Sequence, residues 1–221
     1  MKIFEKQIQH LIFLILLLLG IKSYISDSLL KGSFLDIETS TWLLLAIIIP
    51  ILHQVYVWFV WRTELHYSLI SKLLGKNAFK IYATGFTIFF TLRIIFITAL
   101  AISNQISIHF NATISIILSV LLLIPSLYLF YSIVKYFGFK RAFGIDHFDP
   151  SYSKMPFVRD GIFRFTGNAM YVYGFLIAWV PGVIFHSGAA ILVALFSHIY
   201  IWVHYYCTEF PDIRRIYSKS K

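Results

Sequence analysis

Charged residues are scarce in this chain. They make up 13% of its 221 residues, whereas hydrophobic residues make up 59%, and the mean hydropathy is +0.77. A soluble globular domain has about 25% charged and about 45–50% apolar residues. This composition excludes a soluble domain and predicts a single integral membrane domain.

Cysteine is nearly absent, since Cys207 is the single one. One thiol excludes an internal disulfide and a metal cage built from several cysteines. Basic residues outnumber acidic ones by 19 to 10, which gives a formal net charge of +9. In a membrane protein such an excess is expected at one face of the bilayer, so we expect no nucleic-acid partner. With a single cysteine, we also expect no bound metal.

The sequence contains long apolar runs that could cross a membrane. About 20 apolar residues cross a bilayer as a helix. Such runs lie at 8–26, 40–61, 79–102 and 110–135, and a longer one covers 170–207. The last run contains "HSG" at 186–188, so we expect a tight helical hairpin over 170–185 and 188–207. The predicted fold class is all-α: a polytopic integral membrane protein with five or six transmembrane helices and a C-terminal helical hairpin.

The basic residues are distributed unevenly over this layout. If the N-terminus is cytoplasmic, 16 of the 19 lie on the cytoplasmic side, only Lys22 and Lys31 lie outside, and Arg93 lies within a span. The 16 are Lys2, Lys6, Arg62, Lys72, Lys76, Lys80, Lys135, Lys140, Arg141, Lys154, Arg159, Arg164, Arg214, Arg215, Lys219 and Lys221. The asymmetry follows the positive-inside rule and predicts that both termini are cytoplasmic.

This layout predicts one domain, residues 1–221, with four parts. The N-terminal helices occupy 1–135, a cytoplasmic loop 136–169, the hairpin 170–207 and a cytoplasmic tail 208–221. The loop is long, and loops of more than about 12–15 residues are usually functional or disordered. Its alternative interpretation is an amphipathic connector that lies on the lipid surface.

Polar groups gather where the hairpin begins and ends. His198, Trp202, Tyr205 and Glu209 follow one another at i, i+4, i+7 and i+11, which makes one helical stripe. An acid near the membrane surface needs a polar partner. Because the hairpin is short, we expect Glu209 to lie close to residues 168–171, although the stripe alone is also typical of an ordinary interfacial aromatic belt.

The sequence "GIFRFTGNAMY", followed by the hairpin and "EFPDIRRIY", resembles the C-terminal half of membrane-embedded methyltransferases. These are the isoprenylcysteine carboxyl methyltransferase and phosphatidylethanolamine N-methyltransferase group. The matching positions are Gly161, Arg164, Asn168, Met170 and Tyr171 in the first element and Glu209, Pro211 and Tyr217 in the second. The resemblance covers about residues 135–221.

Several positions depart from the family signature. Ala169 replaces a proline, Gly167 an arginine and Phe210 a second glutamate. Asn168 stands where many members have histidine, and asparagine is the choice of the phospholipid enzymes. The departures bear on cofactor contacts or on activity itself.

The resemblance implies an S-adenosylmethionine site between the loop and the last helix. Its implied cofactor-binding residues are Gly161, Arg164, Asn168, Ala169, Met170, Tyr171 and Glu209, and its catalytic candidates are Glu209 and Asn168. Glu209 suits the cofactor's ammonium or ribose, and Arg164 suits its carboxylate. An amine acceptor must lose a proton, with Glu209 or His204 as the base. The implied substrate partitions into the membrane, either as a phospholipid amine or as a prenylcysteine-like carboxyl.

Two other functions remain open. A membrane sterol or enone reductase that uses NADPH has a similar C-terminal pattern, but no basic cluster is clearly devoted to a 2′-phosphate. A non-catalytic protein, either a transporter or a degenerate family member, is the other; against transport, no Asp or Glu lies within a span.

Two local expectations concern Arg93 and the turn that opens the hairpin. Arg93 should face the bundle interior, with Gln54 or His53 as a structural partner in preference to a lipid phosphate. In "GNAMY" we expect positive φ or close approach at Gly161 and Gly167. We also expect an extended Asn168, which would let proline replace Ala169.

Overall fold

The computed structural model describes residues 2–27 and 29–218. Lys219 and Lys221, two of the basic residues expected in the cytoplasm, lie outside the described residues. The structure is 81% helical with almost no sheet, which confirms the all-α fold class. The long helices are α1 (Gln7–Tyr24), α2 (Thr39–Tyr67), α4 (Ala78–Ser103), α5 (Ala112–Ser132) and α9 (Gly188–His204).

Shorter elements connect them. Before α4 these are η1 (Lys2–Phe4), β1 (Ser33–Phe34), β2 (Ile37–Glu38), α3 (Leu69–Leu74) and η2 (Gly75–Asn77). After α5 come η3 (Ile133–Phe137), α6 (Phe139–Ala142), η4 (Ile145–His147), η5 (Pro150–Lys154) and η6 (Gly161–Arg164). The C-terminal region adds α7 (Ala169–Tyr173), η7 (Gly174–Ala178), α8 (Trp179–Ile184), η8 (Tyr205–Glu209) and α10 (Phe210–Ser218).

Five helical stretches are long and apolar enough to cross a membrane. They are Lys2–Tyr24, Thr39–Tyr67, Leu69–Ser103, Ala112–Phe137 and Gly188–Ser218. A sixth apolar stretch, Ala169–Ile184, is shorter. Helices satisfy their backbone hydrogen bonds internally, as the bilayer core demands, and the chain is therefore a multi-pass membrane protein.

The C-terminal hairpin has the turn that the sequence predicts. The chain reverses at 185–187, where His186 has a φ of 54° and the Ser187 side chain caps α9 by accepting a hydrogen bond from Ala190 N. The two arms approach closely, since a Cβ at Gly182 would lie 2.8 Å from Ile191 backbone nitrogen. Glycine is therefore required on this face of α8.

Two element boundaries differ from those expected. Helix α2 continues to Tyr67 rather than ending near residue 61. The last helix also passes residue 207, because the π-helical turn η8 leads directly into α10. The end of an apolar run predicts where a helix leaves the hydrocarbon of the bilayer. Both helices continue beyond that point, into the polar end of the bundle, so their ends lie beyond the predicted ones.

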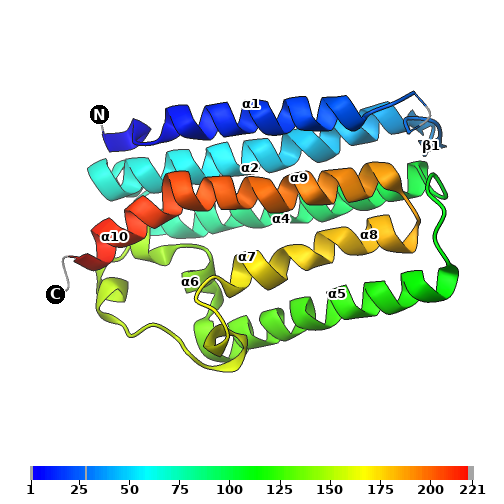
Figure 1. Cartoon of the computed structure of the whole chain (residues 1–221). Coiled ribbons are helices and arrows are strands. Elements are labelled where there is room, and N and C mark those ends of the chain that lie inside the picture. Colours follow the sequence, from blue (N-terminus) through cyan, green and yellow to red (C-terminus); the bar gives the residue numbers. More distant parts are fainter. Residues whose placement is uncertain (1, 28, 219–221) are drawn as a thin grey trace.

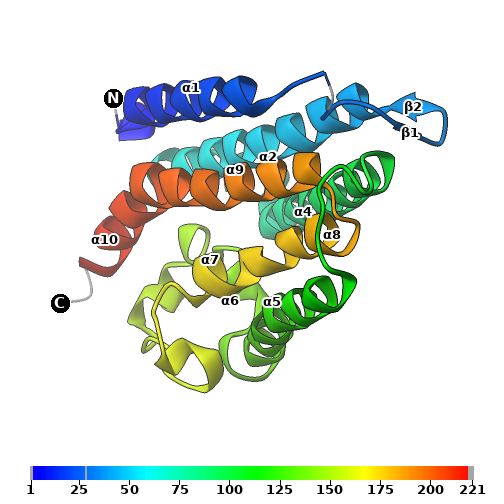
Figure 2. The same cartoon turned by 45° about the vertical axis from the view of Figure 1, so that its right-hand side comes forward.

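The helices form one elongated bundle (Figure 1). Helix α9 packs against α1, α2, α4 and α8, while α5 packs on η7 and α8, and Figure 2 shows α1 and α5 on opposite sides of α9. The principal core lies where α2, α4 and α9 meet. Small side chains there let the helices come close; its alanines are Ala46, Ala99, Ala101, Ala189, Ala190 and Ala194.

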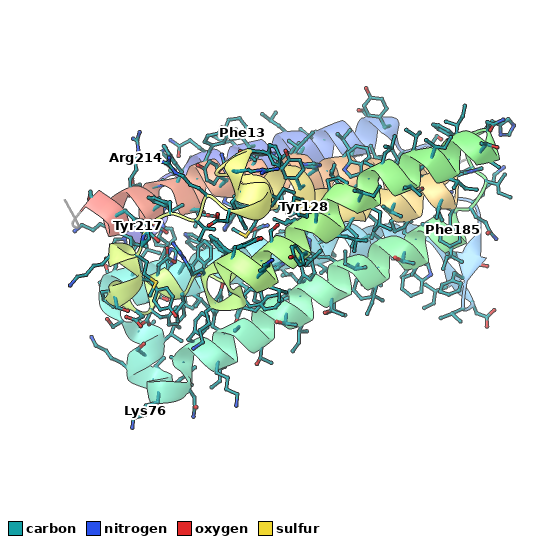
Figure 3. All side chains as sticks on the ribbon, turned by 90° about the horizontal axis from the view of Figure 1, so that it is seen from below. Phe13, Lys76, Tyr128, Phe185, Arg214 and Tyr217 are labelled. Atoms are coloured by element: carbon teal, nitrogen blue, oxygen red, sulfur yellow. The ribbon has the colours of Figure 1, made fainter. Side chains whose placement is uncertain are left out.

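The two ends of the bundle differ. One end holds the described N-terminal residues, the loop and α10 (Figure 1). Lys76, Arg214 and Tyr217 lie at this end, and Phe185 lies at the other (Figure 3). The bundle thus gathers at one end the segments that the charge pattern assigned to one side, while which side that is stays a prediction.

Candidate functional site

A cavity of about 310 Å³ lies inside the bundle. Helices α2, α4, α5 and α9 and the segment α7–η7 surround it. Most of its lining is apolar. The polar or ionisable lining side chains are His53, Gln54, Trp61, Thr87, Arg93, Tyr171, Ser197, His204 and Glu209. Such a space suits a largely apolar ligand that carries a few polar groups.

Tyr171 and Glu209 meet at the end of this cavity near the loop. The Tyr171 hydroxyl donates a hydrogen bond to Oε2 of Glu209. The Tyr171 ring also packs against Trp202 and Tyr205, with ring centroids 5.7 Å and 5.3 Å away. The expected proximity of residues 168–171 to Glu209 is thereby confirmed.

The predicted stripe on the last helix faces α7, η7 and α8. Its deepest member, His198, accepts a hydrogen bond at Nδ1 from Trp179 Nε1 at 3.2 Å and packs on Phe175. His198 therefore fastens the hairpin arms together. This arrangement gives it a packing role.

Arg62 determines where Glu209 sits. The π-turn η8, which ends at Glu209, interrupts the regular hydrogen bonding of the helix. Arg62, fully buried at the end of α2, donates from Nη2 to the carbonyl oxygens of Cys207 and Thr208 at 3.3 Å and 3.2 Å. The guanidinium thus satisfies backbone groups that η8 presents and holds the turn that carries Glu209.

A buried charge network extends from Arg62 into the loop. Arg62 Nε lies 2.8 Å from Asp212 Oδ2, and His147 lies between Asp146 at 3.2 Å and Asp212 at 3.7 Å. The Trp61 ring stacks on His147 at 4.2 Å. The network joins α2, η4 and α10 behind the Tyr171–Glu209 pair.

The loop members of this network have shifted pKa values. Burial works against the charged form of His147, but the hydrogen bond with Asp146 and the negative charges of Asp146 and Asp212 outweigh it and raise its pKa to about 9. Burial likewise opposes ionisation of Asp146, yet the His147 bond and charge and the Tyr217 hydroxyl bond lower its pKa below the usual value. His147 is therefore an imidazolium at neutral pH.

Sequence reasoning missed this network. Arg62 reads as one more cytoplasmic charge, and Asp146, His147 and Asp212 lie in polar stretches that appear solvated. The sequence signal that could have revealed the network is Asp212 in "EFPDIRRIY", an acid that directly follows an apolar helix. A charged side chain that is buried is nearly always paired.

The turn at 168–170 differs from the expected conformation. Asn168 has φ −101° and ψ 30°, so the predicted extended conformation is wrong. The cause is local, because the Asn168 carbonyl already accepts hydrogen bonds from Tyr171 N and Val172 N, which begins α7.

The side chains of this turn point to different places. Ala169 is 1% exposed and packs with Leu129 and Phe163, whereas Met170 lines the cavity. The Asn168 side chain lies against Tyr205.

The two glycines of this region have different roles. Gly161 has a φ of 58°, and a Cβ there would lie 2.6 Å from Ser132 Oγ, so positive φ and close approach are both confirmed. Gly167 has neither: its φ is not positive, and a Cβ would meet nothing within 4 Å. The expectation for Gly167 is therefore wrong, because the chain there runs free of neighbouring elements.

Arg164 lies apart from Glu209. Its side chain is exposed, and its guanidinium carbon stacks 4.7 Å from the centroid of the Phe165 ring. It is not among the residues that line the cavity. The structure thus brings Glu209, Tyr171 and Met170 together at one cavity and leaves Arg164 outside it.

Arg93 faces the interior, as expected. Its Nη1 lies 3.5 Å from His53 Nδ1, and its guanidinium carbon lies 5.0 Å from the Phe175 ring centroid. An arginine at the centre of a span costs about 2.5–3.5 kcal/mol on insertion scales, so these contacts matter. His53 is the confirmed partner, while Gln54 lines the same cavity.

His204 also lines the cavity, and it is 2% exposed. Neither of its ring nitrogens has a hydrogen-bond partner among the described residues. It lies between His10 and Trp61, with ring centroids 6.0 Å from each. In the described part of the chain, no three His, Cys, Asp or Glu side chains form a group that could hold a metal ion.

Comparison with known proteins gives one family match. No curated protein and no solved structure gives a significant match. The model of the phospholipid methyltransferase family, PEMT, matches residues 114–220, a range that includes Tyr171, Glu209 and Asp212. Residues 114–220, which run from α5 to α10, are thus similar to the phospholipid methyltransferase family, in agreement with the resemblance seen in the sequence.

Proposed function

We propose that this protein transfers a methyl group from S-adenosylmethionine to a substrate that partitions into the membrane. One observation carries the proposal: the Tyr171–Glu209 pair lies at one end of a cavity whose lining is mostly apolar. A charged cofactor and an apolar acceptor need such a junction. The family match over residues 114–220 supports methyltransferase chemistry.

Glu209 and Tyr171 are the proposed centre of the cofactor site. The Glu209 carboxylate can accept hydrogen bonds from an ammonium group or from ribose hydroxyls. Tyr171 holds that carboxylate in place and can itself bond a ligand. Asn168 supplies an amide next to Tyr205, and we propose it for the adenosine or the reacting group.

The remaining site candidates act through the backbone or at the rim. Ala169 is buried, so its contribution is the backbone of the first α7 turn, beside Met170. Gly161 sets the chain direction after the loop. Arg164 is exposed, and since the described structure shows it stacked on Phe165 rather than in an ion pair, a cofactor carboxylate can recruit it.

The chemistry needs positioning more than a catalytic triad. When bound, S-adenosylmethionine supplies an electrophilic methyl group on its sulfonium. The apolar walls keep water away from that methyl, and the bundle holds the acceptor for in-line approach. If the acceptor is an amine, its proton must leave before attack, and Glu209 or His204 is placed to accept it.

We propose a phospholipid amine or a prenylcysteine-like carboxyl as the acceptor. Asn168 is the choice of the phospholipid enzymes, which favours the amine. We also propose that the chain acts as one domain in which residues 208–221 complete the cofactor site. By the positive-inside rule, this end of the bundle and both termini face the cytoplasm.

Cofactor titration of the detergent-purified protein tests the proposal. Wild-type protein should bind S-adenosylmethionine. Glu209→Gln should weaken binding by about 1.5–3 kcal/mol, as for a lost hydrogen bond to a charged group, which is about 10- to 150-fold. Glu38→Gln makes the same change at the opposite end of the bundle and should have no effect.

The rival functions give different outcomes in the same titration. Binding of NADPH in place of S-adenosylmethionine would indicate a membrane reductase. Binding of neither cofactor by folded protein would indicate a non-catalytic protein. Unchanged affinity in Glu209→Gln would remove Glu209 from the site.

A further inference from the structure

Arg93 occupies the deeper part of the cavity without an acidic partner. It lies near the middle of α4 and faces His53 and Phe175. Among the described residues that line the cavity, Glu209 is the only acidic one, and it is bonded to Tyr171. The positive charge of Arg93 therefore faces a space that lacks an anion.

The Arg93–His53 contact leaves two hydrogen-bond donors unused. A guanidinium can only donate, so Nδ1 of His53 accepts, and a neutral ring then carries its proton on Nε2. Nη2 of Arg93 and Nε2 of His53 are both buried, and neither has a hydrogen-bond partner in the described structure. His53 is 3% exposed, so this part of the wall is rich in buried N–H donors.

The two donors, on Arg93 and His53, lie deeper in the cavity than the Tyr171–Glu209 pair of the proposed cofactor site. Phe175, which Arg93 contacts, follows Tyr171 by four residues on the continuous segment α7–η7. At a rise of 1.5–2.0 Å per residue, four residues span about 6–8 Å. Arg93 therefore lies about one helical turn deeper than the Tyr171–Glu209 pair, in the same cavity.

We propose that Arg93 and His53 form a subsite for an anionic oxygen group, a phosphate or a carboxylate, on the bound amphiphile. Such a group would accept from Nη2 and Nε2 and neutralise the guanidinium charge. That this ligand is the methyl acceptor rests on the proposed function. The acceptor is then an anionic amphiphile whose acidic group lies about one helical turn from the atom that receives the methyl.

Binding of two matched probes tests the subsite. Dodecyl phosphate and dodecanol share one chain and differ in the anionic group. Titrated calorimetrically into the full-length protein in dodecyl maltoside, dodecyl phosphate should bind at least about tenfold more tightly, as for a charge-assisted hydrogen bond. Dodecanoate, titrated in the same way, reports whether a carboxylate serves as well, and tighter binding of either anion supports the subsite.

Three variants separate the subsite from general electrostatics. Arg93→Gln should abolish the preference for the anion, and Arg93→Lys should retain part of it. Arg159→Gln removes the same charge from an exposed loop position and should retain it in full. A preference that survives in Arg93→Gln, or that falls equally in Arg159→Gln, would overturn the proposal.

The wild-type measurement tests the subsite even if Arg93→Gln does not fold. If neither anion binds more tightly than dodecanol, the subsite is refuted. S-adenosylmethionine titration on the same samples separates the two proposals. Cofactor binding without anion preference overturns the subsite alone. Anion preference without cofactor binding overturns the methyltransferase function and leaves the anion subsite standing.

Discussion

Arg62 and Asp212 form an ion pair in which both side chains are fully buried, with 2.8 Å between Nε and Oδ2. The pair joins the end of α2 to α10 across 150 residues of sequence. Arg62 also bonds the carbonyl oxygens of Cys207 and Thr208. The position of Glu209 thus depends on a contact that no local sequence pattern contains.

Asp212→Asn should destabilise the protein strongly. The substitution leaves the Arg62 charge buried without its counter-charge, which typically costs about 3–5 kcal/mol. Glu5→Gln is the control, because Glu5 lies 3.7 Å from Arg62 with a side chain 39% exposed and should cost at most about 1 kcal/mol. Denaturant unfolding in detergent measures both, and equal losses would contradict a special role for Asp212.

Stability should fall as pH rises through the titration of His147. Its folded-state pKa is raised from 6.5 to about 9, because Asp146 and Asp212 favour the imidazolium despite burial. The pairing is therefore fully present below about pH 6.5 and is lost as pH rises through about 9. The shift corresponds to roughly 3 kcal/mol.

Unfolding at pH 6 and pH 10 measures this dependence. His147→Gln lacks the titrating group, so it should be less stable than wild type at pH 6, and the difference should shrink at pH 10. Other groups titrate in both proteins and cancel in the comparison. A constant difference across this range would refute the assignment.

Gly161→Ala and Gly167→Ala should have opposite effects on stability. A left-handed φ costs a non-glycine residue about 1–2 kcal/mol. The new Cβ at 161 would also displace Ser132 Oγ, which accepts from Ile162 N. Alanine at 167 meets open space and should be neutral or stabilise by up to about 1 kcal/mol. Equal unfolding free energies for the two variants would contradict the assigned role of Gly161.

Ala169→Pro should destabilise the opening of the hairpin. Proline is favoured at the first position of a helix, but it would drive Asn168 from ψ 30° toward the extended region. Its ring would also overfill a site that is 1% exposed, at a cost of about 1–3 kcal/mol.

Ala112→Pro is the matched control for this change. Ala112 is exposed and begins α5, and the preceding Asn111 is already extended at ψ 127°. Proline should therefore be tolerated there or stabilise by about 0.4–1 kcal/mol. A thermal midpoint for Ala169→Pro at or above that of Ala112→Pro would refute the conformation of this turn.

Cysteine labelling tests the orientation in the membrane. Ser151 and Ser33 are both exposed and lie near opposite ends of the bundle. In intact cells that express Cys207→Ala variants, an impermeant maleimide should label Ser33→Cys and reach Ser151→Cys only after permeabilisation. The reverse pattern would place the cofactor site outside.

The sequence by itself determined the spans, the hairpin and the meeting of Tyr171 with Glu209. Span positions follow from apolar run length against bilayer thickness. The meeting follows from connectivity, because a short hairpin returns its exit to its opening. Both inferences use only order along the chain, and the family motifs lie on these same segments.

Only the tertiary structure decided how the charged residues pair. Arg62 reads in the sequence as a surface charge beside a span, yet it is fully buried and forms an ion pair with Asp212. Gly161 has a left-handed φ and lies close to Ser132, whereas Gly167 has no positive φ and no neighbour within 4 Å of a Cβ. Burial and pairing depend on which distant segments pack together, and hydropathy carries no information about that choice.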